Sequence, residues 1–314
     1  MKDHLIKFLG DRESKIVYWA VALLILFCFP LSVLTQTWDY SSVEIVDTGQ
    51  GRYKAFVIQH PKDKRKVKGY LHLTLVVSPS MLERGIAQVQ SGARSGLYPY
   101  ESALRHLVEA INKYTDIKAD FGKRVAMADP ELLKVPWVFI SSDVFYPTDV
   151  ELTNLGRYLL NGGFLFLDAG SGIGSRKDIN LRNIIRKALA KIGKPCEFRR
   201  LSKNHRIFHC YFDFDTVPLA FSAISPRWGG RSSLRYPDYL VGVEVEGRTA
   251  VVLCYADIGR TWQGHPAQTN INISPQMSST HYTRSLQFGI NTIIYALTQK
   301  GSINERILKE KLGD

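Results

Sequence analysis

The sequence has little cysteine, and none of it forms a C-x-x-C motif. Cys28, Cys196, Cys210 and Cys254 are the four cysteines among 314 residues. A zinc knuckle or a thioredoxin-type redox site needs two cysteines at that close spacing, so the sequence excludes both. Cys28 lies in an apolar segment, and the other three are an odd number, which argues against a complete disulfide framework.

Phosphate-binding and nucleophile motifs are also missing. The turn "DAGSGIGS" begins at Asp168 and has the spacing G-x-G-x-G. A dinucleotide fingerprint needs G-x-G-x-x-G, and a P-loop needs G-K-[ST]. A nucleophile elbow needs small residues two positions on either side of the nucleophile, but Ile173 stands two after Ser171. The sequence therefore predicts a plain connection between a strand and a helix, and it gives no sign of a cofactor.

Acidic residues are in the minority, with 29 against 41 lysines and arginines and a net charge of +12. A basic excess indicates an anionic partner, which is a nucleic acid, an acidic lipid surface or an acidic protein. No nucleic-acid motif with interleaved aromatic residues occurs, so nucleic acid is not expected.

The basic charge is concentrated in residues 176–206, which hold eleven lysines and arginines against two acids, a net of +9. Arg182, Arg186, Lys187 and Lys191 lie away from the apolar stripe of a predicted helix there. Two interpretations stay open: an ordinary solvated helix face, or a surface that binds anionic lipid or an acidic partner.

One long apolar run is present, at residues 16–34, with nineteen residues and no charge. At ~1.5 Å per residue a helix of this length spans ~28 Å, close to the hydrocarbon thickness of a bilayer. The run predicts a transmembrane anchor at 16–38; a cleaved signal peptide and a buried core helix are the alternatives. Four basic residues precede the run, which places residues 1–15 in the cytoplasm and the main domain across the membrane after a linker at 39–52.

The rest of the chain alternates between strand and helix patterns. "RYKAFVIQ" and "GYLHLTLVV" predict a hairpin with a basic tip at 62–68. Further strands are predicted at 117–127, 135–142, 164–168, 197–201, 206–212, 239–247 and 249–256. Helices are predicted at 98–111, from a capping box at Thr148 and Glu151 to Asn161, at 181–192 and at 280–298. This order predicts an α/β domain at 53–300, with a mostly parallel sheet and helices on both faces, followed by a C-terminal tail at 301–314.

Three residues are candidates for a site. Asp168 ends a predicted central strand and Asp257 follows another, and ligands bind at such strand ends in open α/β sheets. His205 begins "HRIFHCYFDFD", where polar and apolar residues alternate as in a half-buried strand. Residues four apart in a strand are ~13 Å apart, so the histidines and aspartates of this stretch are not expected to share a metal ion.

Several stretches together resemble a known family: "KGYLHLTLVVS", "PWVFISSD", "LTNLGRYLLNGGFLFLDA", "NHRIFHCYFDFD" and "YLVGVEVEGRTAVVLCYADIG". They are similar to the bacterial domain-of-unknown-function family 4159, over roughly residues 52–299. The resemblance implies a fold like that of class I glutamine amidotransferases, with a flavodoxin-like sheet. Catalytic relatives of that fold carry a cysteine at a sharp turn after a central strand, where this chain has Asp168, Ala169 and Gly170.

The resemblance also implies a cellular setting. Family members are typically exported or membrane-anchored, and they tend to be found beside genes for AAA-type ATPases and for von Willebrand factor A-like membrane proteins. We therefore expect a single-pass protein of the bacterial inner membrane whose periplasmic domain is a non-catalytic interaction or scaffold component of an envelope complex. The alternative is a hydrolase or small-ligand-binding domain that uses Asp168, His205 and Asp257 at the strand ends.

The anchor is testable by carbonate extraction of membranes and N-terminal sequencing. A spanning helix at 16–34 keeps the chain in the membrane pellet with its amino terminus intact, because carbonate does not dissolve the bilayer that holds the helix. A mature chain that begins near Gln36 and appears in the soluble fraction contradicts the anchor and identifies a signal peptide.

Overall fold

The computed structural model describes residues 40, 53–90, 100–141, 145–170, 172–218, 237–264 and 275–312. The chain divides into two units, Met1–Val43 and Glu44–Asp314, and the described helices and strands belong to the second. The predicted membrane segment at 16–34 lies outside the described residues. Within them, no helix is both long enough and apolar enough to cross a bilayer.

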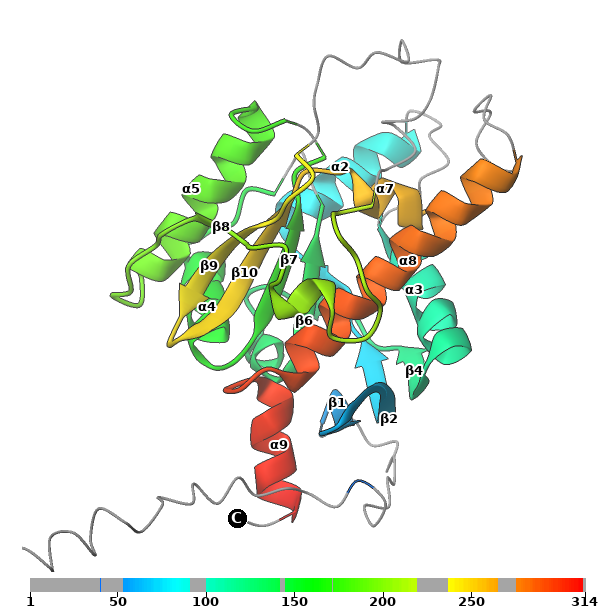
Figure 1. The fold of residues 1–314 in the computed structure, drawn as a ribbon. Coiled ribbons are helices and arrows are strands. Elements are labelled where there is room, and N and C mark those ends of the chain that lie inside the picture. Colours follow the sequence, from blue (N-terminus) through cyan, green and yellow to red (C-terminus); the bar gives the residue numbers. More distant parts are fainter. Residues whose placement is uncertain are drawn as a thin grey trace, which may run out of the picture. The chain divides into compact units, whose positions relative to one another are not determined.

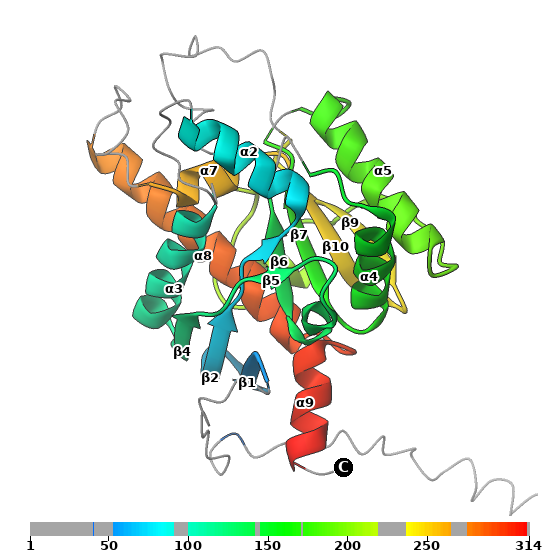
Figure 2. The same ribbon diagram turned by 180° about the vertical axis from the view of Figure 1, so that it is seen from behind.

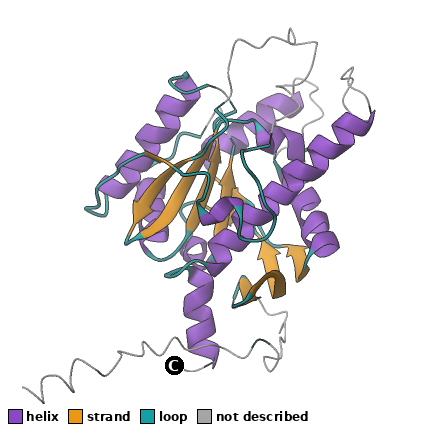
Figure 3. Ribbon diagram, in the orientation of Figure 1, coloured by secondary structure: helices purple, strands orange, loops and turns teal. Residues whose placement is uncertain are grey.

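Strands and helices alternate along most of this unit (Figures 1 and 3). The strands are β1 (Ala55–His60), β2 (Asp63–Leu73), β3 (Val76–Val77), β4 (Asp116–Phe121), β5 (Val125–Ala126), β6 (Trp137–Ile140), β7 (Phe164–Asp168), β8 (Arg199–Arg200), β9 (Val241–Val245) and β10 (Arg248–Cys254). The α-helices are α2 (Pro79–Gln90), α3 (Glu101–Tyr114), α4 (Asp149–Leu160), α5 (Arg176–Ala190), α7 (Ile258–Trp262), α8 (Pro275–Thr298) and α9 (Ile303–Leu312), and the short 3-10 helices are η1 (Pro130–Lys134) and η2 (Arg206–Phe208).

The central sheet has five strands in the order β6-β7-β10-β9-β8. β7 is an inner strand and pairs in parallel with β6 and β10, whereas β9 runs antiparallel to both β10 and β8. The sheet is therefore mixed rather than mostly parallel. The reason is the two-residue connection between β9 and β10: Glu246 and Gly247 have φ of 52° and 71°, the left-handed pair that closes a tight hairpin and forces antiparallel pairing.

The amino-terminal strands form a smaller sheet with the order β1-β2-β4. β1 and β2 make the predicted hairpin, although β2 already begins at Asp63, so most of the expected basic tip is strand. β2 pairs in parallel with β4, and β3 pairs in parallel with β5 just beyond them.

Helices cover both faces of the central sheet (Figures 1 and 2). On one face, α8, α7 and α3 pack on an aromatic core in which the rings of Phe139 and Trp262 have centroids 5.0 Å apart and those of Phe166 and Trp262 6.0 Å apart. On the other face α4 packs on α5, and a side chain at Gly156 would lie 2.4 Å from the carbonyl oxygen of Ala188. This close contact requires glycine.

The connection from α4 to β7 confirms the capping pattern of the sequence. Thr148 and Glu151 form the predicted capping box at the start of α4, and Asn161 is its C-cap. The hydroxyl group of the buried Tyr158 then donates to the Phe164 carbonyl oxygen (2.7 Å) and accepts from the Phe164 amide (2.9 Å), as a neighbouring strand would. The buried Arg248 side chain donates to the carbonyl oxygens of Leu159 and Gly163, where the helix dipole favours a positive charge.

The segment after residue 300, expected as a tail, belongs to the domain. It carries α9, and the buried Asn304 side chain accepts a hydrogen bond from the Val57 amide (3.0 Å) and donates one to the Val57 carbonyl oxygen (2.8 Å). α9 therefore satisfies the outer edge of β1.

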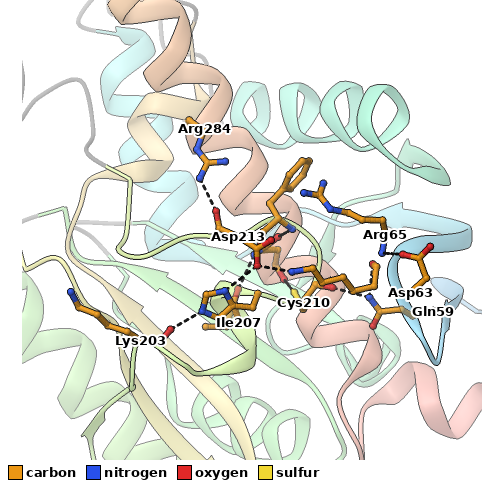
Figure 4. A network of polar contacts seen from close by, with 12 residues as sticks. Gln59, Asp63, Arg65, Lys203, Ile207, Cys210, Asp213 and Arg284 are labelled. Atoms are coloured by element: carbon orange, nitrogen blue, oxygen red, sulfur yellow. Dashed lines mark hydrogen bonds and ion pairs between the residues drawn. The ribbon is translucent and has the colours of Figure 1, made fainter.

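The prediction of a strand at 206–212 is wrong. This stretch consists of η2 followed by turns, because a buried side chain on α8 takes over its backbone hydrogen bonds. Asn291 accepts from the Phe212 amide (2.8 Å) and donates to the carbonyl oxygens of Phe212 (2.8 Å) and Ile207 (3.1 Å). Figure 4 shows this segment between α8 and the β1–β2 hairpin.

We expect Asn291→Leu to destabilise the domain by about 3 kcal/mol or more, because it leaves three buried backbone groups unpaired at about 1–3 kcal/mol each. Urea unfolding followed by tryptophan fluorescence measures the change. Asn204→Leu is the matched control, since Asn204 is exposed and its side chain makes no hydrogen bond within the described part of the chain. An equal, small effect of both substitutions would contradict the role of Asn291.

Candidate functional site

Asp168 is the last residue of β7, and its side chain is buried at the carboxyl edge of the central sheet, where the parallel strands end. Its Oδ2 accepts from the Gly259 amide at 2.7 Å and its Oδ1 from the Gly170 amide at 3.2 Å. Gly259 lies in the first turn of α7, so one carboxylate joins the end of β7, the glycine turn and α7.

A second carboxylate lies beside the first. Asp257 follows β10 and adopts the left-handed conformation, with φ 54° and ψ 37°, as the N-cap of α7. A side chain at Gly170 would lie 2.9 Å from Asp257 Oδ1, so the glycine turn passes directly over this carboxylate. The structure thus brings Asp168 and Asp257 together, as strand-end positions in neighbouring parallel strands should be.

The two carboxylates affect each other electrostatically. Burial, and then the charge of Asp257, raise the pKa of Asp168 to about 7, while hydrogen bonds from backbone amides oppose the rise. A buried acid beside a second carboxylate favours its protonated form. The pair is therefore suited to hold a proton near neutral pH.

The glycine turn is fixed at its far end by a third carboxylate. The Gly174 amide donates to Oδ2 of the buried Asp178 at 2.9 Å, and Ser175 caps α5 by accepting from the Asp178 amide at 3.2 Å. The amides of Gly170 and Gly174 therefore both bind the protein's own carboxylates. A phosphate group cannot use these two donors without displacing Asp168 or Asp178.

Asp178 also places Arg182, which changes the interpretation of the basic face. Arg182 Nε donates to Asp178 Oδ1 at 2.7 Å, and its guanidinium donates to the Tyr255 hydroxyl at 2.6 Å. The Tyr255 hydroxyl in turn donates to Asp178 Oδ1 at 2.9 Å. Arg182 is therefore a structural residue with a side chain only 18% exposed, and not part of a solvated face.

The other predicted basic residues of α5 do lie on the surface. Arg186 and Lys187 are exposed, and Lys191 pairs with Asp149 at 3.0 Å. Within the described chain, five of the eleven basic side chains of residues 176–206 have a carboxylate partner, including Lys194 with Glu246 and Arg199 with Glu197. Asp178 and Glu197 are already counted in the net charge of this stretch, so the three partners from outside it, Asp149, Asp238 and Glu246, offset only part of the +9.

His205 lies near the amino-terminal end of β10, at the opposite end of the sheet's strands from Asp168 and Asp257. Its Nε2 is 3.4 Å from the Thr249 hydroxyl at the start of β10, whereas Asp257 follows the end of that strand. Five residues of strand cover ~16 Å. Burial lowers the pKa of His205, and its Nδ1 accepts from the Ile207 amide at 3.3 Å. The three candidate residues Asp168, His205 and Asp257 therefore do not form one site.

The described cysteines are not activated nucleophiles. Cys210 and Cys254 are buried, and burial raises the pKa of Cys210 to about 12 and that of Cys254 well above its ordinary value. Burial also raises the pKa of the half-buried Cys196. A reactive thiol needs the opposite shift.

The turn at 203–213 brings His209 and Asp213 to within 3.1 Å, which the predicted strand would not allow. Across the described ranges, no group of three or more histidine, cysteine, aspartate or glutamate side chains is arranged to hold a metal ion.

Sequence reasoning missed Asp178 and Tyr255. The pattern Ser175-x-x-Asp178 is a capping signal, so Asp178 could have been placed at the start of α5. Tyr255 follows a strand and carries no pattern of its own, and only the fold brings it to Asp178.

Residues 85–297 match the family described as "Domain of unknown function (DUF4159)", and the chain therefore belongs to this family. No protein with curated annotation matches the chain.

The pKa of Asp168 predicts a pH-dependent stability. The unfolded carboxyl group has a pKa near 4 and the folded one about 7, so the folded state holds the proton more tightly and stability falls as the pH rises from about 4 to about 7. In Asp168→Asn this contribution is absent. Urea unfolding gives the free energy of unfolding of the wild type and of this variant at each pH. We expect the value for the wild type, relative to that of the variant, to fall by a few kcal/mol between pH 5 and pH 8.

Asp257→Asn is the matched variant for the same experiment. It removes the neighbouring charge that raises the pKa of Asp168, so the loss of stability on raising the pH should be smaller and should end at lower pH. A difference between wild type and Asp168→Asn that stays constant across this range would mean that Asp168 is ionised throughout.

Proposed function

We propose that this chain is a membrane-anchored, non-catalytic interaction domain of a bacterial envelope complex, with a glutamine amidotransferase-like, flavodoxin-like α/β fold. The anchor at 16–34 and a periplasmic position for residues 53–300 come from the apolar run and the basic residues before it. Partners of the AAA-type ATPase or von Willebrand factor A-like class are what the family resemblance implies.

One observation carries the non-catalytic part of the proposal. At the carboxyl edge of the central sheet, where this fold class places its chemistry, the Gly170 and Gly174 amides of the glycine turn bind Asp168 and Asp178. His205 lies at the other edge of the sheet, and Cys254 is buried with a raised pKa. The described groups at this edge hold one another in place instead of facing a substrate.

A second function, a hydrolase or small-ligand site, is favoured by one feature. Asp168 and Asp257 are neighbouring carboxylates, and the raised pKa of Asp168 would let the pair act as acid and base near neutral pH. The described chain supplies neither a thiol nucleophile nor a metal-binding group to work with this pair.

Asp257→Asn separates the two functions, because asparagine tolerates the left-handed backbone of this position. We expect the variant, as the only copy in the cell, to support normal growth and to retain the cross-linked protein partners of the wild-type chain in native membranes. Leu165→Asp is the control for loss of fold, since Leu165 is completely buried in β7. A folded Asp257→Asn variant that keeps its partners but loses function in the cell would support the enzyme.

A further inference from the structure

Two arginines from distant parts of the chain lie on one aromatic segment. The Arg65 guanidinium, from β2, is 4.6 Å from the centroid of the Phe212 ring and 5.1 Å from that of Tyr211. The Arg284 guanidinium, from α8, is 4.0 Å from the centroid of the Phe214 ring. Figure 4 shows both side chains reaching toward this segment, and we call them the arginine pair.

The protein fixes the orientation of Arg284 by hydrogen bonds, and it pairs neither arginine of the pair with a carboxylate among the described residues. Arg284 donates to the Asp213 carbonyl oxygen at 2.8 Å and to Gln287 Oε1 at 2.9 Å, so its plane is held. Neither guanidinium has a carboxylate within ion-pair distance in the part of the chain that the structure describes. The Asp213 carboxylate is instead bound to Lys64 at 2.5 Å and to His209 at 3.1 Å.

The two charges also act on each other. Partial burial, and then the charge of Arg65, lower the pKa of Arg284, whereas Asp213 and Asp215 oppose the shift. The hairpin around Arg65 is itself basic, with five lysines and arginines against one aspartate in residues 62–68. Like charges held close together at a surface are stabilised when an anion binds between them or beside them.

We propose that the arginine pair binds carboxylate side chains of an acidic segment in a partner protein. This inference rests on the proposed interaction function and names the chemistry of its partner. A guanidinium stacked over an aromatic ring can still pair with a carboxylate through its N–H groups, and Arg284 keeps its Nε–H and one hydrogen on each terminal nitrogen beyond its bonds to Gln287 and Asp213. The stacking fixes these groups in advance, which lowers the ordering cost of binding.

An acidic protein suits this surface better than an anionic lipid layer. Peripheral lipid binding combines basic residues with apolar side chains that enter the bilayer. Here Tyr211, Phe212 and Phe214 are at most 7% exposed and face the core. The large apolar side chains that are exposed within the described residues come from other segments: Ile86, Tyr146, Val150, Leu160, Ile173 and Ile179.

The test measures binding of a labelled oligoglutamate peptide to the full chain in mild detergent, by fluorescence anisotropy at low and high salt. We expect salt-sensitive binding that falls about tenfold or more in Arg65→Gln/Arg284→Gln, since both guanidinium groups are removed. Arg157→Gln/Arg176→Gln removes the same charge from α4 and α5 and should change the affinity less than about twofold. Arg65→Lys/Arg284→Lys keeps the charge and should still weaken binding, because lysine cannot pair through two parallel bonds.

Equal losses in the arginine-pair variant and the control variant overturn the proposal, because net charge alone then explains binding. So does preferential binding of micelles that contain phosphatidylglycerol, if the arginine-pair variant abolishes it, since the surface then recognises lipid. Thermal unfolding of each variant verifies that it is folded.

Cross-linking in native membranes distinguishes this inference from the proposed function. If the arginine-pair variant captures the same proteins as wild type, the surface is wrong and the interaction function stands. If wild type itself captures no protein, the interaction function fails as well.

Discussion

A carboxylate that ends a buried strand must find its hydrogen-bond donors inside the protein, and the carboxyl edge of this domain is arranged around that requirement. Asp168 draws the amide of Gly259 from α7 and that of Gly170 from the glycine turn. Asp178 fixes the other end of the same turn. Because these amides are used within the fold, both ends of the glycine turn at this edge are held by the protein's own carboxylates.

Much of the fold could be predicted because its signals are local. The apolar run of β7 and the capping box of α4 were placed correctly, since strand burial and helix capping depend on residues within a few positions. The mixed direction of the central sheet was not predicted, although its signal is also local: strands joined only by Glu246 and Gly247 are too close in sequence to pair in parallel. A non-local contact decides residues 206–212: their alternation is real, but Asn291, about 80 positions later, supplies the hydrogen bonds that a strand partner would have supplied.

The candidate site shows the same division. Asp168 and Asp257 could be brought together from the sequence, because parallel strands end at one edge. His205 could not be placed, since nothing local says which edge of the sheet a loop residue reaches. Arg182 was predicted on a solvated face because its position on the helix is away from the apolar stripe, yet Asp178 and Tyr255 hold it in a half-buried network. Pairing between polar residues from separate elements overrides the pattern of a single helix.

The bond between Asn304 and Val57 joins residues 247 positions apart, the first strand of the domain and its last described helix. A ribosome makes the amino-terminal end first, so β1 emerges long before the helix that satisfies its outer edge. Throughout that interval the edge is open, and unpaired strand edges are where chains join one another into aggregates. The outer edge of β1 is therefore satisfied only after α9 has been made, and a chain that stops before α9 retains an edge on which a second chain can pair.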